Sequence, residues 1–303
     1  MLTQILIEKI KQEGGAKSKT FWNTKRKIAG KGIKNEYATI DEDGCEITDP
    51  EKAKQHIADY YENLYQAREG KPEYAQYTEE IERNVKKITE GDLKDKRPNP
   101  ITIKEVKKSI KKMKAGKATG PDNIPNEVFK EADECLVNNV TVVLNNIAQK
   151  KIIPAQWQEG SIVRLYKGKG KKGKCSNERG ITLSSNAGKM FERIMNDRMN
   201  DKIKISENQA GGQKGKSTTD HILLLKQIIK EGKRMKKPVY IVYLDVTKAY
   251  DKAWLGAILH VMRKEGLDTP EWEIMKKLNK TLTARIRTKH GNNRQIKIKD
   301  SIR

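Results

Sequence analysis

The sequence predicts an α+β protein, in which a helical N-terminal region precedes a mixed region of helices and a small sheet. Two observations carry this prediction. Capped stretches with apolar residues every three or four positions recur along the chain, and that spacing is typical of amphipathic helices. Short runs rich in β-branched and aromatic residues, at 161–166, 239–244 and near the C-terminus, are instead typical of strands.

Composition and charge point to a folded protein with a polyanionic partner. The chain has 303 residues, with 63 Lys and Arg against 40 Asp and Glu, for a net charge of +23. Such an excess of positive charge repels itself unless a polyanion shares the surface, so nucleic acid is the first predicted partner. The alternative is a Lys-rich protein from an organism of biased composition.

The cysteines and the apolar runs narrow the class of protein further. Cys45, Cys135 and Cys175 lie far apart and form no Cys-x-x-Cys pair, which argues against a zinc site, and their odd number argues against a disulfide framework. No apolar run is long enough to span a membrane, and the N-terminus lacks the continuous apolar stretch of a signal peptide. We therefore expect an intracellular protein without a membrane partner.

The first predicted elements fall within residues 1–95. A short helix is expected at 5–11, and two strand-like runs, 37–40 and 45–47, flank a turn typical of a hairpin. Thr48 or Asp49 then caps a helix that Pro50 opens, with apolar residues on one face. The polar stretch 92–100, which ends with two prolines, is a predicted linker.

Two helices and a turn follow the linker. Thr102 and Glu105 have the spacing of a capping box, which opens a helix with lysines on its outer face. That helix breaks at Gly116, and the sequence Gly-Pro-Asp at 120–122 predicts a turn. A long helix is predicted over 126–150.

The remaining elements alternate between strands and helices. Strands are predicted at 161–166 and 181–183, followed by a helix that Ser184 or Ser185 caps. The run 239–244 is continuously apolar, which is typical of a strand covered on both faces. The other predicted elements are helices at 218–231, 253–264 and 271–278, and a hairpin of 285–289 with 295–299.

The end of that apolar strand could carry chemistry. Asp245 follows it directly, so a rigid strand would hold its carboxylate at the edge of a cleft, where Mg²⁺ can bind with phosphate as a further ligand. Nucleotidyl transfer with two metal ions needs more than one carboxylate. Asp251 lies nearby, but we expect it to cap the next helix.

Two other stretches have rival interpretations. Residues 210–217, from Ala210 to Ser217, fit a relaxed P-loop pattern, in which Lys216 would reach phosphates and Asp245 would be the second metal-holding acid of an NTPase. The segment before Ala210 is a poor buried strand, which weakens that interpretation. The run 167–174 of lysines and glycines either attracts phosphate or forms a solvated loop.

These stretches occur together with others in an order that resembles the reverse transcriptase domain of non-LTR (LINE-type) retrotransposons. The resemblance covers the chain from about residue 100 to its C-terminus, with weaker similarity before it. Each motif is weak alone, and the six in this order are strong. They are MKAGKATGPDNIP at 113–125, IVRLYKGKG at 162–170, NERGITL at 177–183, KMFERI at 189–194, NQAG at 208–211 with KSTTD at 216–220, and DVTKAYD at 245–251.

The resemblance implies roles for the last motif. Asp245 is similar to the first metal-binding aspartate of the palm, and Val246 would lend its backbone carbonyl to the same ion. Tyr250 matches the aromatic residue that lies under the incoming sugar and disfavours a 2′-hydroxyl. A flat, rigid ring suits that role because it is a good steric wall. The implied ion is Mg²⁺, with Mn²⁺ as the alternative.

The resemblance also implies contacts to the triphosphate and the template. Lys167 and Arg179 fall where fingers residues hold the nucleotide triphosphate, although Lys169 is as near as Lys167 in register. Two cations would neutralise part of the anion, and an Arg fork can grip it through two hydrogen bonds. The residues that border the template path are Gln209, Gly211 and Lys216.

The implied architecture is a right-hand polymerase with an incomplete palm sheet. Residues 1–95 would be an accessory region, 96–235 the fingers and 236–303 a partial palm. The implied function is RNA-directed DNA polymerase, with an RNA template, a DNA primer at its target and dNTPs as partners, in a nuclear or cytoplasmic ribonucleoprotein.

Departures from the family pattern limit that function. Gly212 stands where the family usually has an aromatic residue, and Lys216 where it often has Arg. No aromatic-x-Asp-Asp tetrapeptide follows Asp245, so we expect this chain alone to lack polymerase activity. The alternatives are a P-loop NTPase that uses residues 210–217 and Asp245, or a non-catalytic basic RNA-binding protein.

Overall fold

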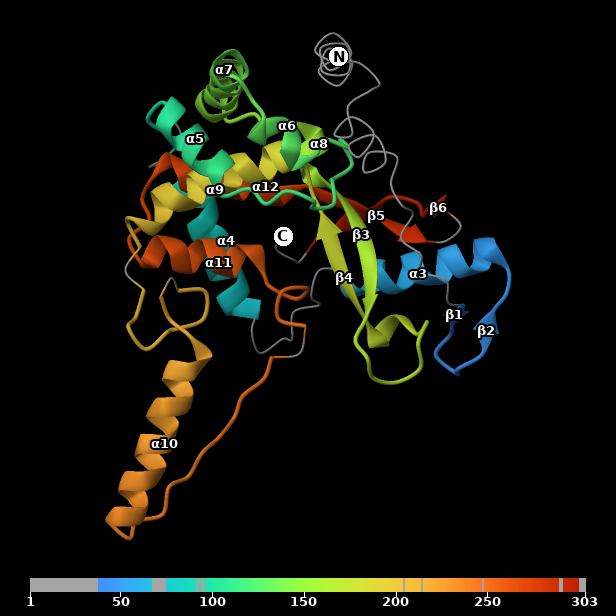
Figure 1. Ribbon diagram of the computed structural model, residues 1–303, viewed down its shortest axis with the longest axis vertical. Helices are drawn as coiled ribbons and strands as arrows, with labels where there is room; N and C mark the ends of the chain where they lie inside the picture. The colour runs from blue at the N-terminus through green and yellow to red at the C-terminus, as the bar shows by residue number, and fades with distance from the viewer. Residues whose placement is uncertain are drawn as a thin grey trace.

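The computed structural model describes residues 38–66, 75–90, 93, 96–203, 205–213, 215–246, 248–288 and 291–299. Helices surround a sheet over most of this part of the chain, while one helix and the extended segment after it project from the rest (Figure 1). The mixture of helices and strands confirms the predicted α+β class. None of the described helices combines the length and the apolar character needed to cross a bilayer.

The N-terminal elements form largely as their local sequence predicts. Strands β1 (Thr39–Ile40) and β2 (Glu46–Ile47) pair in the predicted antiparallel hairpin. Helix α3 (Pro50–Leu64) begins at the predicted cap, where the Asp49 carboxylate accepts a hydrogen bond of 2.7 Å from the Lys52 backbone N–H. The helix predicted at 5–11 lies outside the described residues. A further helix that the sequence did not predict is α4 (Ala75–Glu90).

Helix α5 (Ile103–Lys111) has the predicted capping box. The Thr102 hydroxyl accepts a hydrogen bond of 3.2 Å from the Glu105 backbone N–H, and the Glu105 carboxylate accepts one of 2.8 Å from the Thr102 backbone N–H. This reciprocal pair satisfies two N–H groups that a helix start would otherwise leave without partners.

The prediction of one helix over 126–150 is wrong. The structure has a short helix α6 (Asn126–Lys130) and then α7 (Glu134–Lys150). Asp133 separates them because its carboxylate accepts a hydrogen bond of 2.8 Å from the Leu136 backbone N–H, which starts a new helix. The apolar spacing continues across this break, so periodicity alone did not detect it.

The central sheet joins strands from distant parts of the sequence. Strands β3 (Glu159–Tyr166) and β4 (Glu178–Leu183) form where strands were predicted at 161–166 and 181–183, and they pair antiparallel. Strand β5 (Leu282–Thr288) then runs parallel to β3, with Ile162 opposite Ile286. The predicted C-terminal hairpin is confirmed as β5 with β6 (Gly291–Asn292) and β7 (Ile296–Ile298).

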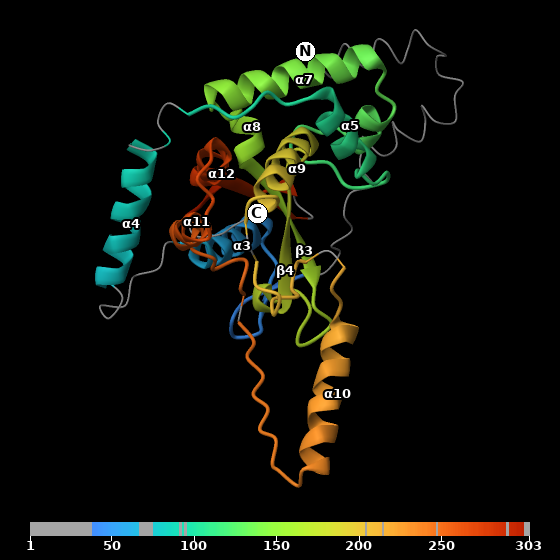
Figure 2. The ribbon, with the colours of Figure 1, turned by 90° about the vertical axis from the view of Figure 1, so that its left-hand side faces the viewer.

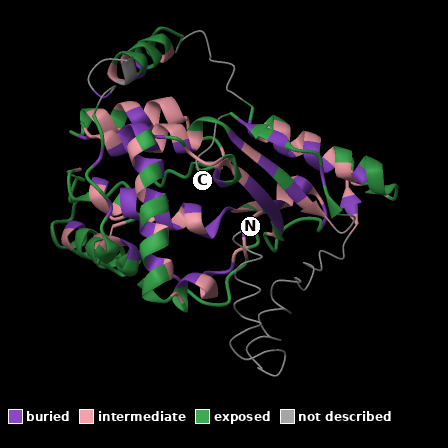
Figure 3. Ribbon diagram, turned by 90° about the horizontal axis from the view of Figure 1, so that it is seen from above, coloured by how far each residue is buried: buried purple, intermediate pink, exposed green. Residues whose placement is uncertain are grey.

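Helices cover this sheet and pack on one another. The largest core lies between α5, α7, α9 and α12, and includes Phe191 and Ile274. A second core lies between α3 and the sheet, where Ile57, Ile162 and Ile286 are buried. Figure 3 shows the buried positions concentrated on the strands and on the helix faces turned toward them. The bounds of the helices not yet given are α8 (Ala155–Gln158), α9 (Asn186–Asn200), α11 (Leu255–Lys264) and α12 (Pro270–Lys280).

Helix α10 (Thr218–Arg234) and the segment after it form an arm that projects from the body (Figure 2). The predicted buried strand at 239–244 is wrong, because these residues are extended without forming a strand. Tyr240 is 88% exposed and Leu244 is 91% exposed. A strand needs hydrogen-bonding neighbours, and none of the described strands pairs with this run. The apolar pattern therefore indicates a surface that favours burial, and no other segment of the described chain covers it.

Candidate nucleotide-binding site

The hairpin of β3 and β4 carries the two cations that the sequence analysis singled out. Arg179 lies opposite Leu165 in the register, and both residues are exposed. Lys167 directly follows β3, where its backbone N–H donates a hydrogen bond of 2.9 Å to the Asn177 carbonyl. Its Nζ donates to the Ser176 carbonyl at 2.8 Å. The hairpin therefore brings Lys167 and Arg179 to the same end of the sheet, near the exposed loop that contains Lys169.

The other face of this hairpin is closed against α3. Arg164 and Glu178 form an ion pair of 3.0 Å between Nη1 and Oε2, with side chains only 3% and 0% exposed. Burial raises the pKa of the neighbouring Tyr61 hydroxyl well above its ordinary value. Burial likewise raises the pKa of the Cys175 thiol to about 11. Beneath the exposed cations of the hairpin there is thus a buried ion pair.

The predicted metal-binding stretch lies open to solvent. Asp245 is exposed, Val246 is 71% exposed and Tyr250 is 76% exposed. Because the preceding run is not a strand, no sheet holds the Asp245 carboxylate in place.

The turn after Asp245 is attached to α3. The Tyr65 hydroxyl donates a hydrogen bond of 3.4 Å to Asp251 Oδ1. Desolvation raises the pKa of Asp251, while Lys248, Tyr65 and Lys167 each act to lower it. The prediction that Asp251 caps the next helix is wrong, because the residue at that cap is Trp254.

Lys248 makes a second contact between this turn and α3. Its Nζ donates a hydrogen bond of 2.8 Å to the Tyr60 hydroxyl and lies 5.0 Å from the centre of the Tyr60 ring. Sequence reasoning missed Tyr60, Tyr65 and Lys248. The only sequence signal for this contact was a group of tyrosines near one another. Such a group does not identify its partner, since Tyr65 and Asp251 are 186 positions apart.

The part of the chain that the structure describes contains no group of three or more His, Cys, Asp or Glu side chains able to hold a metal ion. Asp245 is exposed, and the nearest carboxylate in the motif, Asp251, is turned toward Tyr65. A hard divalent cation in a protein is normally held by several oxygen ligands. These residues therefore do not form a complete magnesium centre.

The predicted template-bordering residues lie together on the loop that leads into α10. Gln209, Gly211 and Lys216 are all exposed there. The P-loop interpretation is not supported, because among the described residues the element before this loop is helix α9 and not a strand. The Ser217 hydroxyl, the group that a P-loop would use to bind Mg²⁺, instead forms a capping box with Asp220 at the start of α10.

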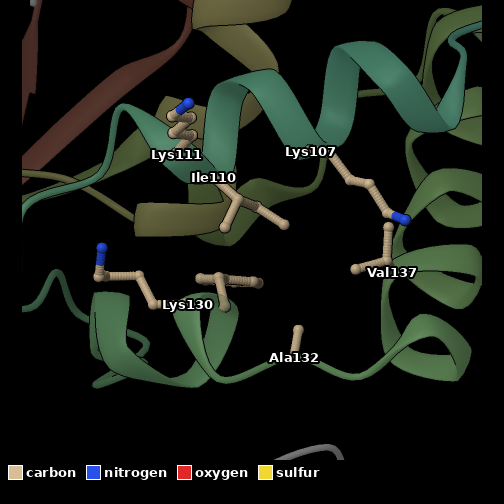
Figure 4. A pocket seen from close by; sticks show the side chains of 7 residues that line it. Lys107, Ile110, Lys111, Lys130, Ala132 and Val137 are labelled. Carbon is tan, nitrogen blue, oxygen red and sulfur yellow. The ribbon is translucent and has the colours of Figure 1, made fainter.

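A cavity of about 220 Å³ lies away from this site, between α5, α6 and α7 (Figure 4). Its floor is apolar, with Ile110 and Phe129, and Lys107, Lys111 and Lys130 stand around it. The lining contains no carboxylate or nucleophile, so its chemistry suits contact with an anion rather than catalysis.

Comparisons with known proteins agree with the motif order. Residues 169–300 match the family model described as reverse transcriptase (RNA-dependent DNA polymerase). The chain is 25% identical over 169 residues to the probable RNA-directed DNA polymerase from transposon BS of Drosophila melanogaster, covering 54% of this chain and 19% of that protein.

Two further relatives come from other mobile elements. The RNA-directed DNA polymerase from mobile element jockey of Drosophila melanogaster is 22% identical over 191 residues, covering 61% of this chain and 21% of that protein. The Pol polyprotein from type-1 retrotransposable element R2 of Nasonia vitripennis is 26% identical over 187 residues, covering 61% of this chain and 17% of that protein. The chain thus spans about a fifth of the length of these curated relatives.

Proposed function

Because this chain carries a reverse transcriptase domain related to those of non-LTR retrotransposons, we propose that it contributes the nucleotide-gripping part of an RNA-directed DNA polymerase. Its substrates in that role are an RNA template, a DNA primer and dNTPs. Residues 96–235 act as fingers, 236–303 as part of the palm and 1–95 as an accessory region. The P-loop NTPase alternative is not supported, because among the described residues no strand leads directly into 210–217.

One observation carries the proposal. Lys167 and Arg179 lie at one end of the β3–β4 hairpin, and the turn that ends the Asp245–Asp251 motif is hydrogen-bonded to Tyr60 and Tyr65 of the helix that covers this hairpin. Both segments contact α3, since Tyr65 donates a hydrogen bond of 3.4 Å to Asp251 and the Tyr61 ring packs closely against Gly180 of the hairpin. This arrangement supports a shared site for two motifs that the family uses around one nucleotide, although α9 and α10 lie between them in the sequence.

These residues have distinct tasks in the proposed site. Arg179 grips the triphosphate through its planar fork, and Lys167 adds a second positive charge. The Tyr250 ring stands against the sugar and excludes a 2′-hydroxyl. Asp245 and the Val246 carbonyl would supply part of the ligand set for the Mg²⁺ or Mn²⁺ that the family uses, and Gln209, Gly211 and Lys216 border the template.

The proposal includes an expectation about activity. One exposed carboxylate does not stabilise the charges of nucleotidyl transfer, for which paired metals need several ligands. The 303-residue chain should therefore show no Mg²⁺-dependent extension of a DNA primer on an RNA template. Extension by the purified chain would contradict this part of the account.

Titration of the chain with a fluorescent dTTP analogue in Mg²⁺ tests the proposal directly. Arg179→Ala should weaken binding about tenfold or more, since charge-assisted hydrogen bonds contribute about 1.5–3 kcal/mol each. The matched control is Arg83→Ala on α4, an exposed Arg distant in sequence from the site. A chain that binds single-stranded RNA but no triphosphate would instead be a non-catalytic RNA-binding protein.

A further inference from the structure

Helix α3 lies against both halves of the proposed nucleotide site. We propose that Tyr60, Tyr61 and Tyr65 are positioning residues that fix the Asp245–Asp251 turn relative to the β3–β4 hairpin. This inference rests on the proposed function, and it adds an accessory helix to the parts that shape the site. Its three supports are the contacts of α3 with the turn, with the hairpin and with the far end of the sheet.

The contacts with the turn involve two tyrosine hydroxyls. Tyr60 accepts a hydrogen bond of 2.8 Å from Lys248 Nζ, and Tyr65 donates one of 3.4 Å to Asp251. Lys248 and Asp251 flank Tyr250 in the sequence, so these bonds hold the turn on both sides of the sugar-facing residue. With both sides held, the Tyr250 backbone has few positions available to it.

Lys248 also shows that the turn is held in an unfavourable conformation. Its φ of 53° lies in the left-handed region, which costs a residue other than glycine free energy. Such a conformation persists only where surrounding contacts stabilise it. The hydrogen bond from Lys248 to the Tyr60 hydroxyl and the contact of its ammonium with the Tyr60 ring stabilise it here.

The contact with the hairpin is close packing by Tyr61. A Cβ atom added at Gly180 would lie 2.8 Å from Tyr61 Cε1, so only glycine lets the ring approach the strand this closely. Gly180 is adjacent to Arg179, which grips the triphosphate in the proposed site. The position of Tyr61 is thereby coupled to the position of that cation.

Helix α3 can serve as a fixed support because the sheet holds it elsewhere. The Tyr65 carbonyl accepts a hydrogen bond of 3.0 Å from the Lys299 N–H, and the Lys54 carbonyl accepts one of 2.7 Å from Asn293 Nδ2. Arg294 also pairs with Asp59 at 2.9 Å and with Glu62. The helix thus links the end of the sheet, the hairpin and the turn.

The test uses Tyr60→Phe and Tyr65→Phe in the whole chain, because each removes a hydroxyl and keeps the ring. Tyr77→Phe on α4 is the matched control, since Tyr77 is 55% exposed. We expect faster hydrogen exchange of the Lys252 and Ala253 amides, which hydrogen-bond back to Lys248 and Tyr250. We also expect dTTP affinity to fall about fivefold, as the loss of one ordinary hydrogen bond gives.

A merely structural role would not produce this combination of results. Affinity for single-stranded RNA and the melting temperature should stay unchanged in both variants. Faster exchange with unchanged dTTP affinity would overturn the positioning role, and unchanged exchange in both variants would overturn the contacts themselves. If the unsubstituted chain binds no dTTP, the proposed function fails, whereas the exchange measurement still decides whether α3 holds the turn.

Discussion

The buried ion pair beneath the nucleotide-gripping hairpin makes a quantitative prediction. Glu178→Gln removes the negative partner of Arg164 and leaves its guanidinium buried with side-chain exposure of only 3%. Breaking a buried pair in this way costs about 3–5 kcal/mol of unfolding free energy, because the remaining charge stays desolvated. Since domains are stable by only about 5–15 kcal/mol, a large part of the chain's stability would be lost.

Urea unfolding followed by circular dichroism measures this loss. The matched control is Glu159→Gln, whose partner Arg285 lies 3.2 Å away on the same sheet but is 44% exposed. An exposed pair contributes about 0–1 kcal/mol, so the control should change stability little. The double variant Arg164→Met/Glu178→Leu should lose less than Glu178→Gln alone, because it leaves no buried charge. A loss below about 1 kcal/mol in Glu178→Gln would refute the closed core beneath the hairpin.

Three further predictions concern acid stability, thiol reactivity and salt. Burial opposes ionisation of Glu105, but hydrogen bonds from Arg198 and Thr102 outweigh it and lower its pKa from 4.5 to about 2. The chain should therefore lose stability as pH falls from 4.5 toward 2, and Arg198→Met should lose less over that range in urea titrations. Cys45 and Cys135 are exposed and should react with a maleimide in the folded chain, whereas buried Cys175 should react only after unfolding. Binding of single-stranded RNA should weaken with salt. In filter-binding assays, log K should fall by about 0.7 per phosphate contact for each tenfold increase in salt concentration.

Local signals in the sequence predicted local structure well. The Thr102–Glu105 capping box and the Asp49 cap are set by residues within three positions of each other, so the sequence states them directly. The β3–β4 hairpin followed from two strand-like runs close in the chain. The parallel pairing of β5 with β3 has no such local signal, and it was not predicted.

The run 239–244 shows where sequence patterns mislead. Its continuous apolar character indicates a need for burial, but burial also needs neighbouring strands, which a pattern cannot guarantee. In the described chain the run is exposed, and Asp245 with it. The anchors of the following turn were missed for a related reason, since Tyr60 and Lys248 are 188 residues apart.

Discrimination between dATP and ATP in Mg²⁺ tests the central claim most directly. The account predicts that the chain binds dATP more tightly than ATP, that Tyr250→Ala reduces this preference, and that Lys216→Ala leaves dATP binding unchanged. Tight ATP binding that Lys216→Ala abolishes and Tyr250→Ala leaves intact would contradict it.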